Sequence, residues 1–488
     1  MKSVRKFALD VGWIFAGSFV VFLLHFLLKP IMARYLGPEG LGLFSMVTTI
    51  VGTITLISGL GINIALVKYF AEYKNDRSRL NALFSSGFAT SLIIGVGTSI
   101  CLFVLSNKLG EIFKMPLLTL LLKISAFVFP FSLAFGIFLG VFSGLREMKF
   151  YSIFNTLNGI MIFLFTMAFL FLGFGVKGAV IGDMLASITV TIFAAVIMKK
   201  YVQFKISNYK ENTIKLTSFG SQLMLGNVIN NVNYQADIIL IGYLLSATDL
   251  GYYSVAVALS RFIWRIPNSI QMVAYPATAE YWAKGEIGSL NKMMDKTMKY
   301  TAFVLLTVGL ILWIFAEEII VILFGQSFLP SVFPFKILIA GTVIYGIGIP
   351  IGGTLAGIGR PDLSFKISAI AAIVDIILNV TLIPLFGIAG AAMATISSLI
   401  IVTTLSIYFI IKLANVSIDI RWFVSAFTVT LLAMVALLVF NEWINLYFLG
   451  SLILSIYILV IIVFFFTGED REICKKIIHS GIFRLFGK

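Results

Sequence analysis

The sequence is poor in the residues from which soluble enzymes build their active sites. Only 12% of its 488 residues are charged, whereas a typical soluble domain carries about 25%, so a soluble globular protein is excluded. The two cysteines, Cys101 and Cys474, give no disulfide framework, and the two histidines, His25 and His479, do not have the usual zinc or haem spacings. We therefore expect no metal and no cofactor.

What the chain has in abundance is apolar sequence. Sixty per cent of its residues are hydrophobic and its mean hydropathy is +1.04. The apolar residues form runs of about 20, the length that an α-helix needs to cross a bilayer. The sequence therefore predicts an all-α, polytopic membrane protein with fourteen spans. These fall near residues 8–30, 41–64, 82–106, 117–142, 150–173, 177–198, 216–246, 250–280, 300–324, 331–357, 365–385, 388–411, 422–441 and 446–467.

The net charge of +14 follows the predicted topology. With the N-terminus inside, most of the 36 lysines and arginines fall in inner segments, as basic residues do in cytoplasmic loops. We therefore expect a multi-pass protein of the cytoplasmic membrane with both termini in the cytoplasm. We expect membrane lipid to be the partner of the basic residues, and nucleic acid is not needed to explain the positive charge.

The chain also repeats itself. LGLFS from Leu41 returns as LGYYS from Leu250, and FGVKGAVIG from Phe174 returns as FGIAGAAMA from Phe386. Both pairs fall at equivalent places in two sets of six spans, which predicts two lobes of the same membrane orientation around a central cavity. The predicted parts are an N-terminal lobe at 1–205, a C-terminal lobe at 206–412, and two added helices with a tail at 413–488.

Three stretches carry a family resemblance. ARYLGPEGLGLFS from Ala33, YQADIILIGYLLSATDLGYYSVAVALSRF from Tyr234 and LAGIGRPDLSFKISAI from Leu355 resemble the Wzx-type polysaccharide transporters. Their superfamily also holds the lipid II flippase MurJ and the MATE drug exporters. The resemblance implies two six-helix lobes, and a cargo of glycan on a polyprenyl phosphate or pyrophosphate that is moved to the outer leaflet.

Charged residues deep in a predicted span are candidates for cargo contact, because each costs about 2.5–3.5 kcal/mol at a helix centre. Arg261 and Arg265 lie deep in the eighth span at spacing i, i+4, which favours two guanidiniums on one face, suited to phosphate oxygens. Arg261 also resembles a cavity arginine of lipid II flippases. The alternative is a structural ion pair with Asp237 or Asp375.

Polar residues of two other spans are further candidates for cargo binding. Asn227, Asn230, Tyr234 and Asp237 recur at spacings of three and four on the seventh span and could bind sugar hydroxyls or hold helices together. His25 and Lys29 share one face of the first span, where Lys29 could instead extend to the membrane surface.

Two intramembrane carboxylates are candidates for ion coupling. Asp183 in the sixth span and Asp375 in the eleventh could bind a cation or carry a proton, although a structural partner is the alternative for each.

The sequence therefore predicts a flippase for lipid-linked oligosaccharide, not an enzyme. A MATE-type exporter of small cations is the alternative, and it predicts an acidic cavity and twelve spans. A membrane-embedded enzyme is disfavoured because the outer loops are short and no nucleotide-binding or catalytic motif stands out.

Overall fold

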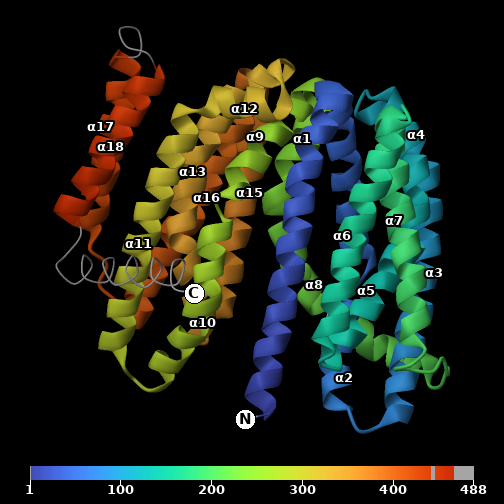
Figure 1. The fold of residues 1–488 in the computed structure, drawn as a ribbon. Coiled ribbons are helices and arrows are strands. Elements are labelled where there is room, and N and C mark those ends of the chain that lie inside the picture. Colours follow the sequence, from blue (N-terminus) through green and yellow to red (C-terminus); the bar gives the residue numbers. More distant parts are fainter. Residues whose placement is uncertain (1, 441–445, 466–488) are drawn as a thin grey trace, which may run out of the picture. The chain divides into compact units, whose positions relative to one another are not determined.

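The protein is an all-α membrane protein, as the sequence predicts (Figure 1). The computed structural model describes residues 2–440 and 446–465, and it contains no strand within these ranges. The helices of these ranges are α1 (Lys2–Ser58), α2 (Ile62–Glu72), α3 (Arg77–Ile112), α4 (Pro116–Ser125), η1 (Ala126–Val128), α5 (Phe129–Gly144), α6 (Met148–Phe171), α7 (Gly175–Met198), α8 (Tyr209–Leu244), α9 (Ala247–Phe262), α10 (Arg265–Ala283), α11 (Ile287–Ile314), α12 (Ala316–Phe324), η2 (Gln326–Ser331), α13 (Val332–Gly352), α14 (Thr354–Gly357), α15 (Pro361–Phe386), α16 (Ile388–Ala414), α17 (Ile420–Phe440) and α18 (Leu446–Phe465).

The number of spans is not fixed by these helices. Within the described residues, ten helical segments are long and apolar enough to cross a membrane, fewer than the fourteen predicted spans. One of the ten, Gly12–Ser58, has 47 residues and covers two predicted spans, because the helix continues through a kink at Gly37. The 36-residue α8 is long enough to span but carries polar side chains along much of its length, so it is not among the ten. The count of fourteen stays a prediction.

Contacts divide the chain into two compact units. The first comprises residues 1–255, 320–331 and 372–394, and the second comprises residues 256–319, 332–371 and 395–488. This division follows packing rather than the internal repeat, so the lobe boundaries predicted from the sequence remain predictions.

The first unit is held together by apolar helices around an aromatic core. Within it α6 packs on α7 and α1, and α5 packs on α2 and α3. Phe70, Phe138 and Phe142 are fully or almost fully buried, and the Phe142 ring lies 5.6 Å from that of Phe154. Buried aromatic rings contribute large apolar areas. This core gives the polar residues described below a fixed scaffold.

The second predicted span is broken inside the first unit. Helix α1 ends at Ser58 and α2 begins at Ile62, and between them Leu60 and Gly61 have φ values of +47° and +64°. This left-handed backbone ends the helix. A side chain at Gly61 would overlap the backbone oxygen of Gly220. Helix α8 therefore packs so closely against the break that only glycine fits at position 61.

The two copies of the repeated LG motif contact each other in the first unit. A methyl group on Gly42 would overlap the carbonyl oxygen of Ala247, and a methyl group on Gly251 would overlap that of Pro38. Pro38 precedes Gly42 by four residues, as Ala247 precedes Gly251. The crossing of α1 and α9 therefore pairs equivalent positions of the repeat.

Candidate functional site

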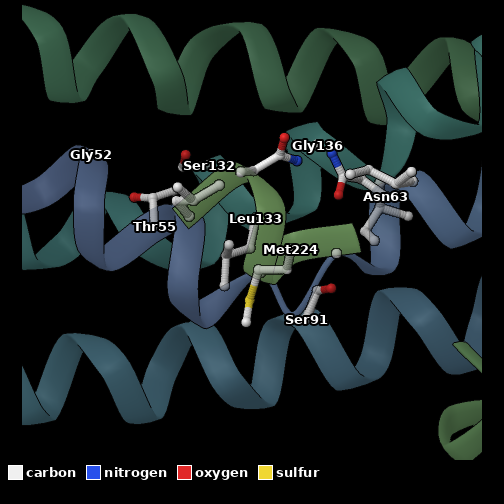
Figure 2. Close-up of a pocket in the computed structure, with 14 residues that line it drawn as sticks. Gly52, Thr55, Asn63, Ser91, Ser132, Leu133, Gly136 and Met224 are labelled. Atoms are coloured by element: carbon white, nitrogen blue, oxygen red, sulfur yellow. The ribbon is translucent and has the colours of Figure 1, made fainter. Parts of the chain in front are cut away.

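A cavity of about 310 Å³ opens beside the break between α1 and α2 (Figure 2). Five polar side chains line it, each from a different helix: Thr55 of α1, Asn63 of α2, Ser91 of α3, Ser132 of α5 and Asn227 of α8. The remaining lining is apolar or glycine. The cavity is therefore a space between helices of one compact unit, with a mainly apolar lining that carries five polar side chains.

Local sequence explains why the space is open. The left-handed turn before Ile62 redirects the chain, so that Asn63 reaches the cavity from a second helix. Gly52 and Gly136 also line the cavity, and a side chain at Gly52 would meet no atom within 4 Å. Larger side chains at Gly52 and Gly136 would occupy the cavity.

The polar side chains of this cavity are not used to hold the fold together. Among the residues that the structure describes, none donates or accepts a hydrogen bond with the side chains of Thr55, Asn63, Ser91, Ser132 or Asn227. Buried polar groups in proteins are normally paired with protein or water, and Ser91 is only 2% exposed. These amides and hydroxyls are therefore available to water or to a polar ligand.

A second cavity, of about 420 Å³, adjoins the first and adds a positive charge. The two share Asn63, Ile64 and Gly136, and the second is also lined by Lys68 and Phe219. The Lys68 ammonium lies 4.1 Å from the centre of the Phe219 ring, a cation–π contact. No carboxylate lines either cavity within the described residues. The combined surface therefore suits a neutral polar group joined to an anion.

The structure divides the polar residues predicted on α8. Asn227 lines the cavity, and the side chain of Asn230 lies outside the described side chains. Tyr234 is half-buried. Asp237 is only 2% exposed and accepts a 2.6 Å hydrogen bond from the Tyr253 hydroxyl, so it joins α8 to α9.

Other polar residues of α8 bond to α1. Asn231 donates a 3.0 Å hydrogen bond to the hydroxyl of Thr53, and the Thr49 hydroxyl donates a 3.3 Å hydrogen bond to Gln235. The four-residue spacing of Asn227, Asn231 and Gln235 puts these side chains on one face of α8, which lies against α1. Helix–helix bonding, one of the two roles considered from the sequence, is therefore seen for Asn231, Gln235 and Asp237, while cargo contact by Asn227 stays a prediction.

Of the two candidates on the first span, Lys29 is bonded to α9. The Lys29 ammonium donates a 2.7 Å hydrogen bond to the backbone oxygen of Ser254. His25, one turn earlier on α1, is exposed. Neither residue lines the two cavities described above.

Arg261 and Arg265 do not lie on one continuous helix. Helix α9 ends at Phe262 and α10 begins at Arg265, so the helix is interrupted for two residues inside the predicted eighth span at 250–280. The intervening Trp264 donates from its indole to the backbone oxygen of Thr342 at 3.2 Å, which fixes the interruption against α13. Arg261 is half-buried, 5.8 Å from the Trp264 ring, and Arg265 is exposed.

The candidate coupling acids have different surroundings. Asp375 is 2% exposed, and Asn379 donates a 3.1 Å hydrogen bond to its carboxylate. The Oδ1 atom of Asn379 is buried without a hydrogen-bond partner in the described part of the chain. Asp183 is half-buried in α7 and makes no hydrogen bond or ion pair with a described residue.

The sequence interpretation missed Asn63, Ser91, Ser132 and Lys68. Serine and asparagine are scattered through many spans, and the charge of Lys68 was explained by topology alone. A signal for Asn63 is present in the sequence, since it follows two glycines, Gly59 and Gly61, near the end of the predicted span 41–64.

Comparison with known proteins adds to this geometry. The sequence model of a family described as "Polysaccharide biosynthesis protein" matches residues 7–282, and that of a family described as "MatE" matches residues 223–381. The chain is 24% identical to an uncharacterized membrane protein of Methanocaldococcus jannaschii, over 98% of this chain and 100% of that protein. It is 25% identical to the probable flippase AglR of Haloferax volcanii, over 57% of this chain and 59% of that one.

A solved structure shares the fold. The chain resembles the lipid II flippase MurJ in its inward closed conformation with a TM-score of 0.76, over 92% of this chain and 97% of that chain. The sequences are 17% identical, so the likeness is one of fold.

Proposed function

We propose that the chain is a flippase for lipid-linked glycan, because it belongs to the polysaccharide biosynthesis protein family. Its cargo is an oligosaccharide on a polyprenyl phosphate or pyrophosphate, which it moves across the cytoplasmic membrane. The names of AglR, a probable flippase, and of MurJ, a lipid II flippase, support this class of transport. A role as a transporter rather than an enzyme agrees with these relatives.

The observation that carries the proposal is the pair of adjoining cavities in the first unit. Asn63, Ser132 and Asn227 offer amide and hydroxyl groups that make no hydrogen bond with a described residue and can therefore bind sugar hydroxyls. Lys68 supplies a cation beside them for a phosphate oxygen. The cavities therefore replace, for a polar headgroup, the water that it loses on leaving the membrane surface.

The remaining candidates stay proposals for other stages of transport. Arg261, Arg265, Lys29 and His25 are proposed to contact the cargo, and Asp375 and Asp183 to couple transport to a cation or proton. The buried setting of Asp375 beside Asn379 supports its coupling role, since an unpaired buried amide oxygen suits a cation. Both termini are proposed to face the cytoplasm, following the distribution of basic residues.

The test is a leaflet-transfer assay with purified protein in vesicles. Fluorescent lipid-linked oligosaccharide is placed in one leaflet, and its arrival in the other is followed by a membrane-impermeant quencher. We expect transfer by the wild type and slower transfer by Arg261→Ala at equal reconstitution. A free oligosaccharide without lipid serves as the control cargo and is expected not to cross. Transfer no faster than in empty vesicles would contradict the proposal.

The MATE-type alternative has one observation in its favour, the match of the MatE family model to residues 223–381. The two cavities disfavour it, because no carboxylate lines them in the described residues and a cationic drug needs a negative partner. Competition by organic cations in the same assay separates the two functions, since only an exporter of cations would be inhibited by them.

A further inference from the structure

The segment that joins α7 to α8 is bonded to α3. In this segment, residues 199–208, the backbone N–H of Gln203 donates to Asn81 at 2.9 Å, and the backbone N–H of Lys205 donates to Ser85 at 2.7 Å. Both acceptors are side chains of α3, and they follow Arg79 by two and by six residues in the sequence. The segment is therefore held along the start of α3 rather than free of it.

A polar pocket of about 350 Å³ lies where this segment meets α3 and α8. Its lining includes Arg79 of α3, Lys215 of α8, and the polar side chains of Tyr73, Ser78 and Ser207. The pocket shares no lining residue with the two cavities assigned to the cargo. It is therefore a separate site with a chemistry of its own.

Two cations face this pocket, and both are positioned by tyrosines. The Lys215 ammonium donates a 2.7 Å hydrogen bond to the Tyr73 hydroxyl and lies 4.6 Å from the Tyr69 ring centre. The Arg79 guanidinium lies 5.2 Å from the Tyr73 ring and pairs through Nε with Asp76 at 3.2 Å. The hydrogen bond that Lys215 donates to Tyr73 raises the pKa of Lys215 above its ordinary value, so this lysine is charged at neutral pH.

The starts of two long helices strengthen the positive potential of the pocket. Ser78 and Arg79 belong to the first turn of α3, and Asn208 is the N-cap of α8. A helix start carries a partial positive charge and exposes N–H donors. Of the described residues that line the pocket, Glu211 is the one acid, and it shares the lining with two cations and these two helix starts.

Exposed apolar residues alternate with polar ones beside the pocket, as at a membrane interface. Phe204 and Ile206 of the joining segment are 59% and 54% exposed, and Ile214 of α8 is 56% exposed. Isolated exposed apolar residues are ordinary, but here three lie next to a basic pocket at the ends of membrane helices. Apolar residues beside basic ones are typical of segments that lie in the headgroup layer.

From this juxtaposition we propose that the pocket binds a phosphate group, and that an anionic membrane phospholipid carries it. Arg79 and Lys215 hold the phosphate oxygens, Ser78 and Ser207 donate to them, and the apolar side chains contact the acyl region. The bound lipid ties the joining segment, α3 and α8 to the membrane surface. This goes beyond the proposed transport, because it concerns a resident lipid and not the cargo.

The test measures lipid retention rather than transport, so it can fail without affecting the proposed function. The protein is placed in phosphatidylcholine nanodiscs containing phosphatidylglycerol, and retained lipids are identified by native mass spectrometry. The double variant Arg79→Gln with Lys215→Gln is expected to retain phosphatidylglycerol about tenfold less, the size of one charge-assisted hydrogen bond. The charge-preserving pair Arg79→Lys with Lys215→Arg is expected to retain it.

A matched control variant removes the same number of positive charges outside the pocket. Lys74 and Lys210 are exposed at the same end of the unit but do not line the pocket, so Lys74→Gln with Lys210→Gln is expected to change retention by less than about twofold. Equal losses in both double variants would overturn the proposal, because attraction would then be diffuse. Displacement of the lipid by inorganic phosphate would overturn the assignment to a phospholipid.

Discussion

The hydroxyl of Tyr253 donates a 2.6 Å hydrogen bond to the carboxylate of Asp237, and both side chains are buried. The bond joins α8 to α9 across the short turn between them. Removing the donor leaves a buried carboxylate with one hydrogen bond fewer, which costs about 1–3 kcal/mol.

We therefore expect Tyr253→Phe to lower the free energy of unfolding by about that amount. Thermal unfolding in detergent measures the change. The neighbouring Tyr252→Phe is the control, since the Tyr252 ring packs on Phe328 at 6.2 Å and its hydroxyl makes no hydrogen bond with a described residue. Equal unfolding temperatures for the two variants would contradict a stabilising role for the Tyr253 bond.

Asn227 and Asn231 are one helical turn apart on α8 and allow transport to be separated from stability. Asn227→Leu removes from the cavity an amide that makes no hydrogen bond with a described residue. We therefore expect transfer of lipid-linked glycan to slow about tenfold, while the free energy of unfolding stays unchanged. Asn231→Leu breaks the bond to Thr53, so we expect a loss of about 1 kcal/mol in stability. If Asn227→Leu transports normally, the cavity is not on the cargo route.

Lys68 tests whether a positive charge in the second cavity matters. Lys68→Gln removes the charge beside Phe219, and we expect slower transfer of phosphate-linked cargo, by about tenfold. Lys68→Arg keeps the charge and is expected to retain most of the rate. Lys74→Gln, which removes an exposed charge outside both cavities, serves as the comparison, and a similar slowing there would assign the effect to surface charge.

The crossing of α1 and α9 predicts a strict need for glycine. Gly42→Ala places a methyl group on the carbonyl of Ala247 and is expected to cost about 1–3 kcal/mol of stability. Gly251→Ala is expected to behave in the same way against Pro38. Gly52→Ala, on the same helix as Gly42 and with no atom within 4 Å of the new methyl group, is expected to be tolerated. Tolerance at Gly42 would mean that the helices can separate there without loss.

The fold class could be predicted from the sequence because it depends on composition along the chain. Apolar runs of bilayer length give membrane helices whatever their neighbours are, and the structure confirms this. The break at Leu60 and Gly61 and the interruption at Trp264 were not predicted, because each is stabilised by contacts with another helix. Hydropathy averaged over a span does not detect a change of one or two residues.

The candidate site could be predicted only in part for the same reason. Asn227 is a candidate from the sequence because it belongs to a repeating stripe on one helix. Asn63, Ser91 and Ser132 come from three different helices and share nothing in the sequence that sets them apart. Their common feature is that packing brings them to one cavity, which depends on tertiary contacts.

The contact between Gly42 and Gly251 also bears on how such a chain could arise. Each glycine approaches the residue four positions before the other, so the two sides of the crossing obey one rule. Two identical copies of such a segment would meet in the same way as a symmetric dimer, with one glycine serving both sides. Joining two such copies in one chain would keep this interface unchanged.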